Sequence, residues 1–259
     1  HLCDRRQRQM CIRDRENMEM FIKAGFTLEE FGENTIKLTG VPDMCLDLDT
    51  KELFLETLDE INTVARTAKQ EKEEKLQDIL RKIGKVAVTY SGGIDSSYLL
   101  KVALDTLGPD NVIAAVVNSE MFSNEEFDLA LDLADQLGAP VLGLEMRELS
   151  DPRIAANTPN IWYYTKQLMY QTIKDSVTEL GFEQLVDGNI MDDIDDFRPG
   201  IKARDEAGVR SVLQEAGLYK TEIRQLAKER GVSNWNKVPS CSVASRFPYC
   251  LLYTSDAAD

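Results

Sequence analysis

The residues best suited to chemistry lie in the segment SGGIDS, residues 91–96. Its two adjacent glycines permit positive φ angles and let the backbone approach a ligand closely. Serine hydroxyls and the amides at a helix N-terminus are hydrogen-bond donors that suit a phosphate group. Asp95 would repel such an anion unless it held a magnesium ion that bridges phosphates. The segment therefore predicts a site for a polyphosphate and Mg²⁺, with these binding residues: Ser91, Gly92, Gly93, Asp95 and Ser96.

A cysteine between two serines is the second candidate for chemistry. Cys241 lies in the segment NWNKVPSCSVASRFPY, residues 234–249, which has neither helical nor strand periodicity. Lys237 and Arg246 are close to it in sequence, and neighbouring cations favour the thiolate, which is the nucleophilic form of cysteine. A buried inert thiol and a pairing with Cys250 are the alternatives.

The elements around residues 91–96 must present them to a ligand. Residues 86–89 (VAVT) form an apolar, β-branched run typical of a buried parallel strand, and a helix is expected from near Ser96. The string matches neither G-x-x-x-x-G-K-[ST] nor G-x-G-x-x-G. An ordinary β-α turn is the alternative. SGGIDS directly after a strand resembles the PP-loop of ATP pyrophosphatases, which cleave ATP to AMP and pyrophosphate while they adenylate a substrate. The resemblance implies that the polyphosphate is ATP.

Strands and helices alternate through the rest of this region. The continuous apolar run at residues 111–118 predicts a second buried strand, and residues 141–144 and 185–186 predict two further strands. We expect an α/β fold with a doubly wound parallel sheet of the PP-loop (adenine nucleotide alpha hydrolase-like, HUP) type, which binds ligands at the carboxyl ends of its strands. The acidic run at residues 191–208 is expected to form a polar loop. Three residues that follow strands are predicted to bind the nucleotide: Asn118, Ser119 and Gly188.

A longer resemblance covers residues 76–249. Six strings occur in order and resemble the LarE family of sacrificial sulfur transferases, which build the nickel-pincer nucleotide cofactor of lactate racemase: TYSGGIDSSYLLK, VVNSEMFSNEEFD, NTPNIWYY, VDGNI, DFRPGIKARDEAGVRSVLQEA and NWNKVPSCSVASRFPY. The resemblance implies that Cys241 donates its own sulfur and that Trp162 stacks on the substrate. Core packing is the alternative for Trp162. Substrate contacts are also expected of Arg198, whose guanidinium suits phosphate or carboxylate groups, and of Ser245 and Arg246 in the loop that carries Cys241.

The same resemblance implies a reaction and its cofactors. ATP with Mg²⁺ adenylates a carboxylate of pyridinium-3,5-biscarboxylate mononucleotide, and the Cys241 thiolate then displaces AMP. Elimination leaves a thiocarboxylate product and dehydroalanine at position 241. Some relatives hold an iron–sulfur cluster with two further cysteines, at positions that are Trp162 and Thr165 here, so we expect no iron–sulfur cluster. The family is homo-oligomeric, but this chain is expected to lack the family's C-terminal domain, which carries oligomer contacts.

The N-terminal part of the chain has a different character. Residues 16–75 are expected to form a small α+β fragment and a linker helix, and residues 16–74 resemble part of the C-terminal region of the mismatch-repair protein MutL. This implies a chimera joined between Glu74 and Leu76, with a native extension as the alternative. Residues 1–15 and 250–259 resemble translated sequencing adapter and are expected to be artefactual or disordered.

The acidic net charge disfavours nucleic-acid partners. The net charge is −15 with a pI near 4.6, which disfavours a nucleic acid because backbone binding relies on clustered Lys and Arg. Residues 76–249 contain 18 basic and 26 acidic residues, a net charge of −8, which disfavours a tRNA thiolase. Two further alternatives to a sulfur transferase stay open: an amidotransferase-type synthetase, and an ATP-binding module without turnover.

Hydropathy and cysteine usage predict the compartment. No apolar run approaches about 18 residues, and no signal peptide is visible, so we expect no membrane association. The five cysteines have no paired spacing, which favours a reducing cytoplasm over a disulfide-bonded scaffold.

Overall fold

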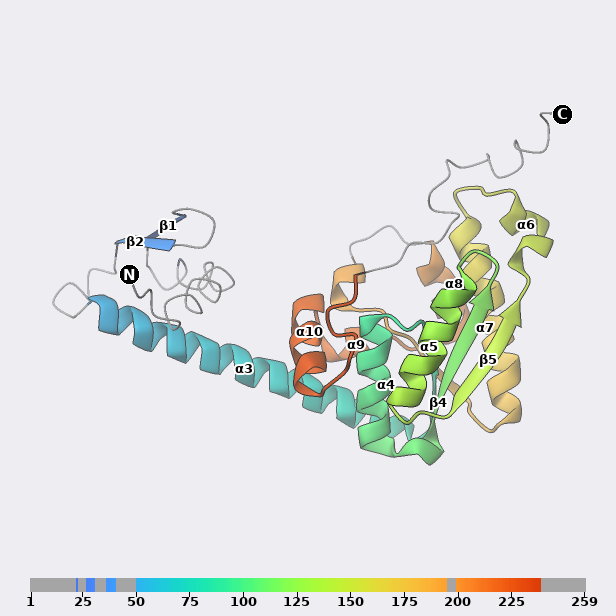
Figure 1. The fold of residues 1–259 in the computed structure, drawn as a ribbon, viewed down its shortest axis with the longest axis horizontal. Coiled ribbons are helices and arrows are strands. Elements are labelled where there is room, and N and C mark those ends of the chain that lie inside the picture. Colours follow the sequence, from blue (N-terminus) through green and yellow to red (C-terminus); the bar gives the residue numbers. More distant parts are fainter. Residues whose placement is uncertain (1–21, 23–26, 31–35, 41–49, 195–198, 239–259) are drawn as a thin grey trace. The chain divides into compact units, whose positions relative to one another are not determined.

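The chain divides into two units between Gln70 and Glu71, and each is described by itself. The computed structural model describes residues 22, 27–30, 36–40, 50–194 and 199–238 (Figure 1). The first unit contains an antiparallel pair of strands, β1 (Thr27–Glu30) and β2 (Ile36–Gly40). Helix α3 (Thr50–Ile83) begins in the first unit and ends in the second.

A four-stranded parallel sheet forms the centre of the second unit. Its spatial order is β5-β4-β3-β6, where β3 is Val86–Thr89, β4 is Val112–Ser119, β5 is Val141–Met146 and β6 is Gln184–Val186. The pairs β3–β4, β3–β6 and β4–β5 are all parallel. The apolar runs of β3, β4 and β6 are largely buried because helices cover both faces of the sheet, whereas the edge strand β5 is exposed at alternate residues.

The two faces of the sheet are covered by different helices. Val86 and Val88 of β3 belong to one core cluster, together with residues of α3, α4 (Ile94–Leu107), α5 (Asn124–Gln136), α9 (Val212–Ala216) and α10 (Lys220–Glu229). Ala87, between them, faces the opposite cluster, which includes α7 (Ile161–Glu179) and Ala207, the last residue of α8 (Gly200–Ala207). This alternation confirms the predicted doubly wound α/β fold (Figure 1).

One local prediction was wrong, and one helix begins slightly earlier than expected. The helix expected from near Ser96 begins at Ile94, so Asp95 and Ser96 lie in its first turn. Residues 191–208, expected as a polar loop, contain α8 and a short 3₁₀ helix at Met191–Asp193. Helix α8 buries only Ala203 fully, so its sequence has no apolar period to reveal it. Its lysine, arginine, alanine and glutamate nevertheless have high helix propensity.

Candidate functional site

The loop between β3 and α4 places the predicted phosphate-binding residues at the carboxyl edge of the sheet. The Ser91 hydroxyl lies 3.2 Å from that of Ser96 and accepts a hydrogen bond from the Gly93 amide at 3.4 Å. Gly93 is the N-cap of α4, and no described side chain caps this end of the helix. The amides of the first turn of α4 therefore have no intrahelical acceptor and suit an anion.

Two glycines allow close packing around this loop. Gly92 has a φ of +66°, and a Cβ atom added there would lie 2.9 Å from Cβ of Ala130 in α5. A Cβ at Gly188, after β6, would lie 3.0 Å from the Ser96 amide nitrogen. The structure therefore brings Gly188 against the start of α4, as expected if both contribute to one site.

Asp95 has one oxygen in an ion pair and one without a partner. Its Oδ2 accepts a hydrogen bond from Nζ of Lys220 at 2.6 Å, whereas Oδ1 is buried with no hydrogen-bond partner in the described part of the chain. Burial raises the pKa of the Asp95 carboxyl, and the hydrogen bond and charge of Lys220 oppose this effect. Lys220, the first residue of α10, also donates its amide to Asp192 at 2.8 Å. No sequence pattern points to Lys220.

The segment after α10 contacts the same loop. The buried side chain of Asn234 donates to the Gly92 carbonyl and to the Ser97 hydroxyl, both at 3.0 Å. Nζ of Lys237 lies 3.4 Å from the Gly92 carbonyl and 3.1 Å from Glu126. Cys241 lies four residues further along, outside the described residues, as do three predicted substrate-binding residues: Arg198, Ser245 and Arg246.

The end of β4 holds the other predicted nucleotide-binding residues. The Asn118 amide donates to both carboxylate oxygens of Glu145, its neighbour on β5, at 3.0 and 3.3 Å. The Ser119 hydroxyl donates to Glu148, which is fully buried. Asn118 and Ser119 thus lie at the same edge of the sheet as the loop of residues 91–96.

Trp162 lies in the first turn of α7 and is half-buried. It packs against a small apolar cluster of Met121, Ile154 and Ile161. Met121 follows β4, so the cluster joins the predicted stacking residue to the predicted nucleotide side. This contact is core packing, and the role of Trp162 in stacking stays a prediction.

Asp187, at the end of β6, is buried and fully hydrogen-bonded. Its Oδ1 accepts from the Ser211 hydroxyl at 2.7 Å and from the Asn189 amide at 3.2 Å. Its Oδ2 accepts from the Asn189 side chain at 2.7 Å and from the Tyr170 hydroxyl at 3.2 Å. Burial raises the pKa of the Asp187 carboxyl. These bonds fix the turn that carries Gly188.

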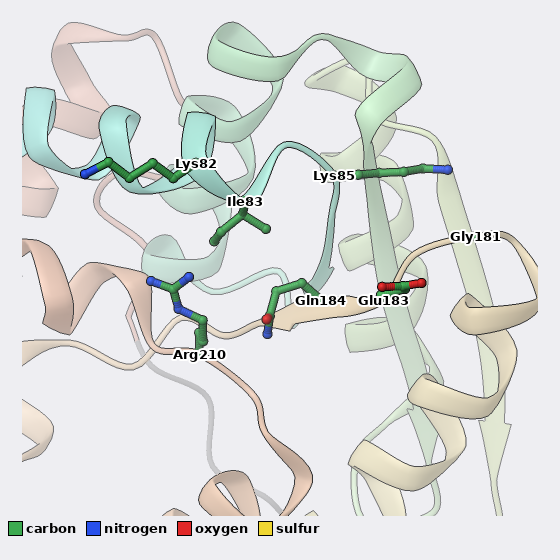
Figure 2. Close-up of a pocket in the computed structure, with 7 residues that line it drawn as sticks. All are labelled: Lys82, Ile83, Lys85, Gly181, Glu183, Gln184 and Arg210. Atoms are coloured by element: carbon green, nitrogen blue, oxygen red, sulfur yellow. The ribbon is translucent and has the colours of Figure 1, made fainter.

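A hollow of about 480 Å³ lies at the opposite edge of the sheet, beside the amino ends of β3 and β6 (Figure 2). Three cations line it, but the ammonium groups of Lys82 and Lys85 point away from each other. Arg210 is paired with Glu215, and Nζ of Lys85 lies 4.2 Å from the centre of the Phe182 ring. The hollow therefore presents no convergent set of charges, and the chemistry is expected at the carboxyl edge.

Different families match the two parts of the chain, and the two matches overlap at residues 68–87. Residues 68–157 match the NAD synthase family, and residues 6–87 match the MutL C-terminal dimerisation domain. The N-terminal match agrees with a 36% identity over 87 residues to the DNA mismatch repair protein MutL of Clostridium botulinum, which covers 34% of this chain and 13% of that protein. The resemblance of this region to MutL is thus confirmed. The domain boundaries, including the expected join between Glu74 and Leu76, stay predictions.

The second unit has a solved structural neighbour of the same fold. The NMN synthetase of Francisella tularensis superimposes with a TM-score of 0.51 and 17% sequence identity over 68% of this chain and 75% of that chain. This likeness concerns the fold alone.

No helix within the described ranges is long and apolar enough to cross a membrane.

Sequence identity to a curated relative is much higher than the 17% identity to this structural neighbour. The chain is 52% identical over 185 residues to the pyridinium-3,5-bisthiocarboxylic acid mononucleotide synthase of Lactiplantibacillus plantarum, which covers 71% of this chain and 67% of that protein. Both the family resemblance and the PP-loop type of fold are thereby confirmed. The chain belongs to the family of pyridinium-3,5-bisthiocarboxylic acid mononucleotide synthases.

Proposed function

We propose that the protein uses ATP to transfer sulfur to a carboxylate of pyridinium-3,5-biscarboxylate mononucleotide, in the biosynthesis of the nickel-pincer cofactor. The observation that carries the proposal is the loop of residues 91–96, whose helix N-terminus has no side-chain cap among the described residues, in a chain 52% identical to a synthase of the corresponding bisthiocarboxylic acid. The reaction is an adenylation that releases pyrophosphate, followed by attack of a thiolate.

The nucleotide is proposed to bind along the carboxyl edge of the sheet. The phosphates meet the first-turn amides of α4 and the hydroxyls of Ser91 and Ser96, which are 3.2 Å apart. Gly92, Gly93 and Gly188 leave room for this approach. Asn118 and Ser119, at the end of β4, face the nucleoside. Lys220 adds a positive charge that the phosphates require.

A magnesium ion fits this arrangement at Asp95. The buried oxygen Oδ1 has no partner among the described residues, and a hard cation prefers carboxylate oxygens. Mg²⁺ is commonly held by one or two carboxylates together with substrate phosphates, so a single protein ligand suffices. Bound there, the ion would neutralise charge on the phosphates.

The sulfur step is proposed for Cys241. The chain from Lys237, which contacts the Gly92 carbonyl, to Cys241 is four residues, and covalent geometry limits that span to about 14 Å. The Cys241 thiolate attacks the acyl carbon, a C–S bond forms, and AMP leaves. Removal of the Cα proton then breaks the Cβ–S bond, so that the sulfur stays on the product and dehydroalanine remains. Trp162, Arg198, Ser245 and Arg246 are proposed to bind the substrate.

A pyrophosphate-release assay tests the adenylation. We expect release that depends on both ATP and the biscarboxylate mononucleotide, with loss of release in Gly93→Val and Asp95→Ala. Cys241→Ala is expected to release pyrophosphate but to form no thiocarboxylate, since adenylation precedes thiol attack. Release that requires tRNA or ammonia in place of the mononucleotide would contradict the proposal.

A further inference from the structure

Glu148 is a fully buried carboxylate that the proposed reaction does not use. It begins a short 3₁₀ helix, Glu148–Ser150, two residues after β5 ends. Its Oε1 accepts hydrogen bonds from the Ser119 hydroxyl and, at 3.2 Å, from the Met121 amide. Its Oε2 is buried without a partner in the part of the chain that the structure describes. Burying a carboxylate is costly, so its position calls for an explanation beyond surface chemistry.

The two residues that Glu148 holds have different predicted surroundings in the proposed site. Ser119 ends β4 and is assigned to the nucleotide. Met121 is 3% exposed, and its side chain belongs to the apolar cluster against which Trp162 packs. A single carboxylate oxygen therefore joins the nucleotide side to the side of the stacking residue.

A second hydrogen bond links the same two segments, and here the carboxylate belongs to the segment after β4. Glu120, between Ser119 and Met121, accepts a hydrogen bond from the Leu149 amide at 2.9 Å. The ends of β4 and β5 are thus linked by two carboxylates, one buried and one exposed. Only the buried one reaches both Ser119 and Met121.

We propose that Glu148 is a positioning residue that fixes Ser119 relative to the apolar cluster of Trp162. ATP and the acceptor carboxylate are thereby brought together in a reactive arrangement. The inference rests on the proposed function. The role depends on the length of the side chain and on an acceptor oxygen, not on its charge. Glutamine keeps both features, aspartate loses the length, and alanine loses the acceptor.

The test uses binding and fluorescence, not turnover. Trp162 and Trp235 are the two tryptophans of the chain, so a Trp235→Phe background leaves Trp162 as the sole reporter. In that background, Glu148→Ala and Glu148→Asp are expected to weaken ATP binding about tenfold in calorimetry, because the half-buried Ser119 hydroxyl loses an acceptor within reach, while the Met121 amide keeps only the Ser119 hydroxyl. They are also expected to red-shift Trp162 emission. Glu148→Gln should retain wild-type affinity within about threefold, and the exposed Glu125→Gln is the matched control.

The pattern among variants decides the question. A residue that only stabilises the fold would lower the melting temperature but leave ATP affinity and Trp162 emission unchanged well below it. Unchanged affinity or unchanged emission in Glu148→Ala would overturn the inference, as would an aspartate variant that performs better than glutamine. If the alanine variant does not fold, the aspartate and glutamine pair carries the test. Absence of ATP binding by the wild-type chain would instead contradict the proposed function.

Discussion

Asp95 determines what the loop of residues 91–96 is able to bind. One of its oxygens is held by Lys220 and the other is buried without a partner in the described ranges. A carboxylate in this state attracts additional positive charge. Lys220 lies 125 residues further along the chain, and a single lysine at the start of an amphipathic helix has no spacing that marks it as functional. This is why the sequence revealed Asp95 and not its partner.

Replacing Lys220 tests the electrostatics of the loop. Lys220→Met keeps much of the side-chain volume but removes the cation beside Asp95, so ATP affinity should fall about 10- to 100-fold. Isothermal titration calorimetry with Mg²⁺ present measures this. Lys101→Met is the control and should bind ATP normally. It removes a lysine of α4 that is paired with Asp105 of the same helix at 2.7 Å. Equal affinities in the two variants would disprove a role for Lys220 in the site.

Asp187 predicts a pH dependence of stability. Burial raises its pKa above the usual value of 3.8, so the folded chain holds this proton more tightly than the unfolded chain. The contribution of Asp187 to stability is therefore greatest below pH 3.8 and declines as the pH rises through the raised pKa. Asp187→Asn lacks this titration, and its partners Asn189 and Tyr170 are able to reverse their hydrogen bonds.

The measurement is urea unfolding of both chains between pH 4 and pH 8. The stability of Asp187→Asn relative to the wild type should increase with pH across this range. A constant or decreasing difference would show that the folded carboxyl does not hold its proton more tightly.

At the scale of elements, the approach of α5 to the loop depends on Gly92. Alanine at position 92 would have to adopt a φ of +66° and place its Cβ 2.9 Å from Ala130. Gly138→Ala provides the control, because Gly138 has a φ of +76° but no atom lies within 4 Å of its added Cβ among the described residues. We expect Gly138→Ala to cost about 1–2 kcal/mol from backbone strain alone.

Gly92→Ala should cost more than this control. The contact with Ala130 is expected to add about 1–3 kcal/mol of overpacking. Chemical denaturation of the two variants compares them directly. Equal losses of stability would mean that α5 is free to move away from the loop.

The elements themselves were predicted where the apolar pattern was strong. Strands β3, β4, β5 and β6 coincide with apolar runs, and the two central strands, β3 and β4, are largely buried between the helices on the two faces of the sheet, as continuous apolar runs require. Helix α8 was missed because it is charged and buries little. The contacts of Asn234 and Glu148 were missed for a different reason. They join segments that only the folded chain brings together, and a buried asparagine or glutamate looks like a surface residue in sequence.

At the scale of the whole molecule, the second unit has its own core. Leu76 and Leu80 of α3 are fully buried in the cluster formed with β3, β4, α4 and α10. Glu73 accepts hydrogen bonds from Tyr98 at 2.8 Å and from Arg230 at 2.7 Å. The part of α3 after Gln70 is therefore integral to this unit.

Two deletions test this division. Removal of residues 1–70 should leave the melting temperature and ATP affinity of the remaining chain nearly unchanged, since the core above is retained. Removal of residues 1–84 also deletes Leu76 and Leu80 and should cost several kcal/mol, because each buried leucine contributes about 2–5 kcal/mol. Differential scanning calorimetry measures the melting temperature of each deletion, and isothermal titration calorimetry measures its ATP affinity. Loss of ATP binding in the shorter deletion would instead show that the first unit is required.

The most direct test of the proposed function is the mass of the peptide that contains Cys241 after a single turnover with ATP, Mg²⁺ and the biscarboxylate mononucleotide. We predict that intact-protein and peptide mass spectrometry will show the loss of one H₂S, localised to position 241, in a chain that then resists alkylation there and fails in a second turnover. Repeated formation of thiocarboxylate by a chain whose Cys241 remains chemically intact would contradict the account and indicate an external sulfur donor.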